Sequence, residues 1–221
     1  MIFKINETIS YIGSNEEPLS AEVGVVRGKE RIWFYDVGNG NAAGEEIREL
    51  LVPVASWGRG VSASSSPELP VRTCGVILSH FHPDHIGNLS CFPAGTEVYV
   101  GENTRKYTQR GLTVTQDLYL EDGCTLHLFP LPSTHAKGSL GLEVNGEYAF
   151  LGDGLYAAQK GDRVVYNAQL LREELRVLKS LKAHTFLISH GDPFCQGREE
   201  TIRQLEEIYS RREKDQPYIQ V

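Results

Sequence analysis

At 221 residues, with 40% hydrophobic and 23% charged residues, the chain has the composition of one globular domain, predicted to span residues 1–221. The formal net charge of −7 disfavours long polyanions, so no nucleic acid partner is expected. No apolar run approaches the about 20 residues that a membrane helix needs, and no membrane partner is expected either. The N-terminus lacks the apolar stretch of a signal peptide, and the four scattered cysteines form no CxxC pair. These features predict a cytoplasmic protein with reduced thiols.

The first part of the chain alternates predicted strands with one helix. Loose alternation over 2–12 indicates a strand pair or an edge strand, and β-rich runs at 21–27 and 31–37 indicate a hairpin. A helix is predicted over about 42–51. Residues 53–71 then lose periodicity, which predicts a surface loop inside the domain.

A cluster of potential metal ligands follows the next predicted strand. The apolar run 74–78 is typical of a buried strand, and it leads directly into Ser-His-Phe-His-Pro-Asp-His. In an extended chain, His80 and His82 point to the same side. The proline then bends the path, so that Asp84 and His85 can face the same space from another direction. Imidazole and carboxylate together suit borderline divalent cations, and this density of ligands predicts a metal site.

The second half begins with further predicted strands and ends with helices. The predicted strands are 97–100, 113–120, 124–130, 140–144, 147–152 and 185–189. An apolar stripe of leucines predicts a helix over 168–182, and a closing amphipathic helix is predicted at about 198–212. Strands that come in runs, with helices late in each half, favour an α+β sandwich of mixed sheets with helices on the outer faces.

Three more polar residues lie just beyond predicted strands. His135 follows the strand at 124–130, Asp153 follows Gly152, and His190 follows Ser189. Loops at strand ends are where sites on a sheet scaffold are built. These side chains are therefore candidates to join the cluster around His80.

The complete pattern, His-x-His-x-Asp-His followed by a distant His, Asp and His, resembles the signature of the metallo-β-lactamase-fold hydrolase superfamily, with the ligand set of the glyoxalase II and lactonase groups. The resemblance implies a four-layer αββα sandwich with a two-metal site at one edge of its sheets. It also implies the ligands: the first metal is held by His80, His82 and His135, the second by Asp84, His85 and His190, and Asp153 bridges both. Asp36, in an Asp-x-Gly after an early strand, either supports the metal loops or bonds within its own turn.

This ligand set predicts a binuclear hydrolase of a small ester, thioester or lactone. The expected cofactors are two divalent ions, zinc first and iron or manganese as options, which supply a bridging hydroxide as nucleophile. Asp84 is placed to shuttle the proton. Tyr156 lies three residues beyond Asp153, and in the lactonases that the chain resembles, a tyrosine at this offset contacts the substrate carbonyl. Cys195 is expected to be a buried, inert thiol.

Other functions stay open on the same residues. Persulfide dioxygenases share the implied fold and a similar ligand set, but they bind one iron and perform oxygen chemistry. A phosphodiesterase or nuclease of this fold is a further alternative, although the acidic charge disfavours it. A non-catalytic binding module has no need of all seven ligands. The pocket for the small-molecule substrate is expected to be shaped by the loops at 53–71, 101–112 and 154–167.

Overall fold

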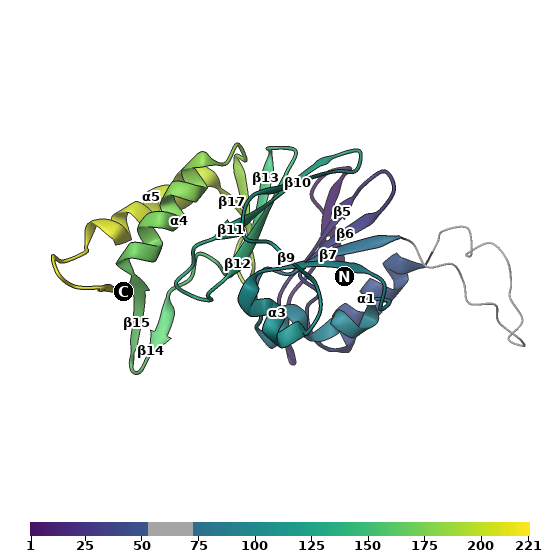
Figure 1. The fold of residues 1–221 in the computed structure, drawn as a ribbon, viewed down its shortest axis with the longest axis horizontal. Helices are drawn as coiled ribbons and strands as arrows, with labels where there is room; N and C mark the ends of the chain where they lie inside the picture. Colours follow the sequence, from purple (N-terminus) through teal and green to yellow (C-terminus); the bar gives the residue numbers. More distant parts are fainter. Residues whose placement is uncertain (53–72) are drawn as a thin grey trace, which may run out of the picture.

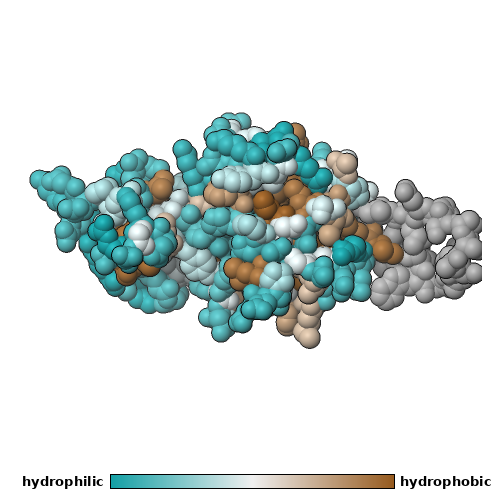
Figure 2. Space-filling model, turned by 90° about the horizontal axis from the view of Figure 1, so that it is seen from below, coloured by the Kyte–Doolittle hydropathy of each residue, from teal (hydrophilic) through white to brown (hydrophobic). Residues whose placement is uncertain are grey.

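The computed structural model describes residues 1–52 and 73–221. The segment 53–71, which the sequence predicts to be a surface loop, lies outside the described residues. No helix in the two described ranges has both the length and the apolar character that crossing a membrane requires. The face seen in Figure 2 is mainly hydrophilic, with hydrophobic patches near its middle. Most of the large apolar side chains of the described residues are buried.

Two large sheets lie between layers of helices (Figure 1). Helices α4 (Ala168–Ser180) and α5 (Arg198–Ser210) cover the outer face of one sheet. Helix α1 (Gly40–Leu51) covers the outer face of the other, and it begins two residues before the predicted helix. The described residues thus form the four-layer αββα sandwich that the sequence predicts.

The first sheet comes from the N-terminal half of the chain. Its strands are β1 (Ile2–Lys4), β2 (Ile9–Ile12), β5 (Val23–Arg27), β6 (Ile32–Tyr35), β7 (Cys74–Ile77), β8 (Glu97–Val100) and β9 (Leu112–Thr113), in this spatial order. Strands β1 to β6 pair antiparallel, whereas β6 to β9 pair parallel. The predicted strand pair at 2–12 and the predicted hairpin at 21–37 are confirmed. A separate short ladder joins β3 (Asn15–Glu16) to β4 (Leu19–Ser20).

The second sheet comes from the C-terminal half. Its strands are β10 (Leu118–Glu121), β11 (Thr125–Leu131), β12 (Ser139–Val144), β13 (Tyr148–Gly152), β16 (Thr185–Ile188) and β17 (Cys195–Gly197), again in spatial order. Strands β10 to β13 form antiparallel pairs, and β13 pairs parallel with β16. The turn between β12 and β13 uses Asn145 and Gly146, whose φ angles of 54° and 66° suit a tight hairpin.

Neighbouring side chains of a strand point to opposite faces of its sheet, so the apolar core forms three layers: one between the sheets and one under each layer of helices. In β6, Tyr35 packs between the two sheets, while its neighbour Phe34 packs toward α1. In β13, Phe150 faces the first sheet, and Leu151 faces the helices α4 and α5. The leucine stripe of α4, represented by Leu171, completes this outer layer. Both sheets are therefore fixed on both faces, which gives their strand ends defined positions.

Some predictions fail where elements are short or exposed. The predicted strand at 113–120 is divided between β9 and β10, which belong to different sheets. Part of the predicted loop 101–112 forms α3 (Glu102–Thr108), in which only Thr104 is buried, so no apolar stripe marks it. Within 154–167, β14 (Ala158–Lys160) pairs with β15 (Arg163–Asn167), which pairs with β18 (Tyr218–Gln220).

The expectation of a buried thiol at Cys195 is wrong, because this cysteine is exposed. Its neighbour Phe194 is buried against the core between the sheets. Phe194 immediately precedes β17 (Cys195–Gly197), and successive side chains of an extended chain point to opposite sides, so burial of the phenylalanine turns the thiol outward.

Candidate metal centre

All seven predicted ligands lie at one edge of the sandwich, where strands of both sheets end. The motif that begins at His80 follows β7, and its second half forms the single turn α2 (Pro83–Ile86) before the 3-10 helix η2 (Gly87–Cys91). His135 lies in the loop between β11 and β12. Asp153 follows β13 directly, and His190 lies two residues beyond β16. Their donor atoms form two groups that share Asp153.

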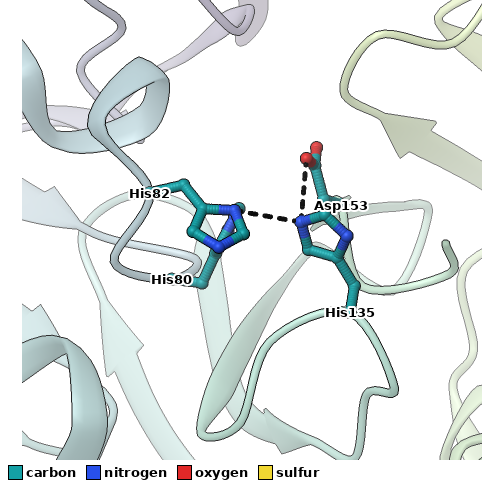
Figure 3. Close-up of side chains that lie close together, drawn as sticks. All are labelled: His80, His82, His135 and Asp153. Atoms are coloured by element: carbon teal, nitrogen blue, oxygen red, sulfur yellow. Dashed lines mark hydrogen bonds and ion pairs between the residues drawn. The ribbon is translucent and has the colours of Figure 1, made fainter. Parts of the chain in front are cut away.

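The first group consists of three imidazoles and one carboxylate that converge from separate loops (Figure 3). His80 Nε2 lies 2.9 Å from His82 Nδ1, which lies 3.1 Å from His135 Nε2. His135 Nε2 is in turn 3.4 Å from Asp153 Oδ2. All four donor atoms lie within 4.8 Å of one another, close enough to bind one cation.

The second group lies on the other side of the shared aspartate. His190 Nε2 is 3.0 Å from Asp84 Oδ2, and His85 Nε2 is 3.4 Å from the same oxygen. Asp153 Oδ1 lies 3.3 Å from His85 Nε2 and 3.9 Å from His190 Nε2. Asp153 therefore directs Oδ2 to the first group and Oδ1 to the second.

The two groups fit divalent cations by both spacing and chemistry. Around a tetrahedral zinc ion with ligands about 2.0–2.1 Å away, neighbouring donor atoms are about 3.3 Å apart. The contacts named above, at 2.9–3.4 Å in the first group and 3.0–3.9 Å in the second, bracket this spacing, and all donor atoms of a group lie within 4.8 Å of one another. Moreover, His85 Nε2 and Asp153 Oδ1 are buried atoms without a hydrogen-bond partner among the described residues. Buried polar atoms are rarely left unpaired, and a cation between these groups would satisfy both.

Asp36 and Ser79 orient two of the imidazoles from behind. The fully buried carboxylate of Asp36 accepts hydrogen bonds from Ser79 N and Ser79 Oγ, each at 2.7 Å, and from His85 Nδ1 at 2.7 Å. Since Ser79 Oγ donates to Asp36, it accepts from His80 Nδ1 at 2.9 Å. Both rings therefore donate from Nδ1 and direct Nε2 to the centre, which is the orientation that metal-binding histidines need.

Asp153 is aimed by an irregularity at the end of β13. The register of β13 against β16 shifts between Phe150 and Gly152. Gly152 has a φ of 55°, and a Cβ atom added there would lie 2.7 Å from the side chain of Ser79. Only glycine permits this left-handed turn at such a close approach, and the bend directs the next carboxylate toward the centre. Gly152 therefore allows Asp153 to reach the centre while its own backbone packs against Ser79, which orients His80.

Comparison with known proteins identifies the fold of the chain. No protein-family model matches the chain, and no curated protein matches its sequence. Among solved structures, a metallo-β-lactamase from Pontibacter korlensis is similar with a TM-score of 0.63 and 18% identity, over 93% of this chain and 97% of that one. The chain has the metallo-β-lactamase fold.

Two other similar structures belong to proteins of different kinds. A sec-alkylsulfatase from Pseudomonas sp. matches with a TM-score of 0.68 and 12% identity, over 95% of this chain but 41% of that one. A variant of the flavo di-iron protein of Thermotoga maritima matches with a TM-score of 0.61 and 15% identity, over 97% of this chain and 56% of that one. The fold is therefore compatible with both hydrolytic and redox proteins, and the reaction must be argued from the site.

Two histidines of this site have pKa values shifted in opposite directions. Burial lowers the pKa of His85, but the carboxylates of Asp36 and Asp153 outweigh this effect and raise that pKa to about 10. Burial and the neighbouring imidazoles lower the pKa of His80 far below its usual range. The metal-free site thus holds a proton on His85, while His80 remains neutral.

Tyr156 lies beside the centre with its hydroxyl already engaged. Its hydroxyl donates to the Ser189 carbonyl at 2.8 Å, and its ring centroid is 6.4 Å from that of His135. Burial raises the pKa of Tyr156 to about 12, so the hydroxyl keeps its proton. To donate to a substrate carbonyl, the phenol must first release Ser189.

Of the three segments predicted to shape the pocket, one supplies Tyr156 beside the centre, and another reaches the ligand His82 through Phe81. Tyr107 on α3, within 101–112, stacks on Phe81 with ring centroids 4.4 Å apart, and Phe81 adjoins His82 at 5.0 Å. Tyr156 represents the segment 154–167. The third segment, 53–71, lies outside the described residues.

Sequence reasoning missed two residues that position ligands. Ser79 directly precedes the motif, and this adjacency was the available signal. Glu22, whose Oε2 accepts a hydrogen bond from His190 N at 2.9 Å, lies far away in the chain without a motif around it. No local pattern could have identified it.

Proposed function

We propose that the chain is a binuclear metal-dependent hydrolase of a small ester, thioester or lactone. The observation that carries this proposal is the position of Asp153, whose two oxygens face two separate groups of ligand atoms. A single carboxylate between two such groups suits a pair of cations held close together. The similarity to a metallo-β-lactamase supports hydrolysis, as an analogy of fold.

Each group supplies enough donors for one cation. The first cation would be held by His80, His82, His135 and Asp153, and the second by Asp84, His85, His190 and Asp153. When bound, the two cations would polarise the carbonyl of the substrate and lower the pKa of a shared water. Zinc is the first choice for this nitrogen and oxygen set, and iron and manganese fit the same atoms.

Within this centre, Asp84 is proposed to accept the proton that catalysis releases. In the metal-free site, burial raises the pKa of Asp84, but the hydrogen bond from His190 and the charge of His85 lower it by more, so the carboxylate is ionised. Its side chain is also more exposed than that of Asp153, 13% against 8%, which gives it better access to a substrate. Tyr156 is proposed to contact the substrate carbonyl after exchanging its bond to Ser189.

Iron-dependent oxygen chemistry is the second candidate. It is favoured by the similarity to a flavo di-iron protein and by a donor set that iron accepts. A persulfide dioxygenase-like reaction would need one iron and would consume oxygen. The identity and number of the bound metals, together with oxygen uptake, therefore separate the two candidates.

The test is turnover on a panel of thioesters, lactones and phosphodiesters, with protein whose metal content has been measured. The proposal expects two metals per chain and hydrolysis of a carbonyl substrate. Asp153→Asn should lose both metal pairing and turnover, whereas the control Asp162→Asn, at an exposed aspartate, should retain both. One iron with oxygen uptake would favour the dioxygenase, and cleavage of phosphodiesters alone would favour a nuclease. Retained turnover by Asp153→Asn with fewer than two metals would contradict the proposal.

A further inference from the structure

One peptide group next to the metal centre is held at both of its polar ends. It joins Ser189 to His190. The Ser189 carbonyl accepts a hydrogen bond from the Tyr156 hydroxyl at 2.8 Å, and the His190 N–H donates to Glu22 Oε2 at 2.9 Å. Two side chains from different parts of the fold thus fix the rotation of one peptide plane.

This peptide needs such support because of its backbone conformation. His190 has a φ of 57°, in the left-handed region that residues other than glycine seldom occupy. In this conformation the imidazole points back toward the centre, with Nε2 at 3.0 Å from Asp84 Oδ2. A backbone conformation of this kind costs free energy, so it persists only where surrounding contacts hold it in place.

Glu22 is suited to this role by its burial and its origin. It lies between β4 and β5 in the N-terminal half, 168 residues before its partner His190, and it is 6% exposed. A hydrogen bond to a buried carboxylate is stronger than one between neutral groups. Glu22 is outside both groups of candidate ligands, so it can act on the centre through the His190 backbone.

We infer that Glu22 is a positioning residue that holds His190 in the geometry needed to bind the second cation. This inference rests on the proposed metal centre. It predicts an asymmetric effect. Loss of Glu22 should free the His190 peptide and weaken the group of Asp84, His85 and His190, while the group around His80 keeps its geometry.

The experiment is a zinc titration of the metal-free protein against a chelating indicator, which reads out each equivalent of metal without turnover. Glu22→Leu removes the acceptor, and Glu22→Gln keeps an amide oxygen in its place. The matched control is Glu143→Leu. Glu143 is equally buried and also accepts backbone N–H bonds, from Lys182 and Ala183, but it is not among the candidate ligands.

Glu22→Leu should weaken the second equivalent about 10- to 100-fold, as is typical for residues that support a ligand, and leave the first equivalent unchanged. Glu22→Gln should restore most of the affinity, and Glu143→Leu should bind both equivalents as the unaltered protein does. In a His190→Ala background, Glu22→Leu should have no further effect on the second equivalent, because the two residues act as a unit.

Three results would overturn the inference. One is unchanged affinity for both equivalents in Glu22→Leu, and another is an equal loss in Glu22→Leu and Glu143→Leu. The third is an additive effect in the His190→Ala background. If Glu22→Leu does not fold, Tyr156→Phe removes only the hydroxyl at the other end of the peptide, and it must show the same selective loss. An unaltered protein that binds no second equivalent would instead refute the proposed metal centre.

Discussion

The substitution Asp36→Asn tests whether the network behind the imidazoles controls the centre. Asp36 has a φ of 59°, and asparagine tolerates this left-handed backbone better than most residues, so the substitution changes the side chain alone. Asparagine can still accept from Ser79 N through Oδ1. At the position of Oδ2, however, it presents an N–H group to two donors, Ser79 Oγ and His85 Nδ1.

The expected cost follows from those two lost hydrogen bonds. A hydrogen bond to a charged group contributes about 1.5–3 kcal/mol, so Asp36→Asn should lower the free energy of unfolding by about 3–6 kcal/mol. That is a large part of the about 5–15 kcal/mol that holds a typical domain folded. The substitution should also shift the His85 proton to Nε2, which removes the lone pair that the second cation needs.

Urea unfolding of the metal-free protein measures the first effect, and zinc titration measures the second. Asp122→Asn is a matched control, because Asp122 is also buried and accepts three hydrogen bonds, from Glu30 N, Arg31 N and Trp33 Nε1. It should lose stability and keep its metal affinity. If Asp36→Asn unfolds at the same urea concentration as the unaltered protein and binds two equivalents, the reasoning about this network is refuted.

Three further predictions concern pH and single residues. His85 has a pKa of about 10 against an ordinary 6.5, so its contribution to metal-free stability is complete below pH 6.5 and should disappear as the pH rises to about 10. The zinc affinity of the second group should rise over the same pH interval, because the His85 ring must lose its proton to bind. Urea unfolding and zinc titration measure these two effects, and a stability or an affinity that does not change with pH would contradict the corresponding expectation. Gly152→Ala should lower the free energy of unfolding by at least about 2 kcal/mol, because its Cβ meets Ser79 in a left-handed turn; unfolding at an unchanged urea concentration would contradict this. Tyr156→Phe should lower kcat on the best carbonyl substrate at least tenfold, about 1.4 kcal/mol, with the first zinc equivalent unchanged; unchanged kcat would exclude a substrate contact.

Elements with a strong apolar pattern could be predicted from the sequence, and exposed or short elements could not. Helix α4 carries a continuous leucine stripe, and its predicted start at residue 168 is confirmed. Helix α3 buries only Thr104, so its sequence contains no periodic signal. The strands β14 and β18 are largely exposed, so neither carries a strong apolar pattern. β14 forms a tight hairpin with β15, whereas β18 pairs with β15 from the far end of the chain, which local patterns do not indicate.

The candidate ligands themselves could be proposed because each lies next to a strand that is easy to recognise. His135, Asp153 and His190 follow β11, β13 and β16, so strand ends made them candidates, and the resemblance to the superfamily signature completed the set. The supporting residues are different. A turn aspartate such as Asp36 has a local role as plausible as its distant one, and Glu22 reaches His190 through a contact that only the folded chain creates.

The division of the ligands between the two sheets has a consequence for assembly. The motif from His80 to His85 belongs to the half of the chain that builds the first sheet, whereas His135, Asp153 and His190 belong to the other half. A fragment ending before β10 would keep the recognisable motif but only part of each ligand group. Separately expressed halves should therefore bind metal tightly only after they associate, which would make a chelating dye a reporter of their docking.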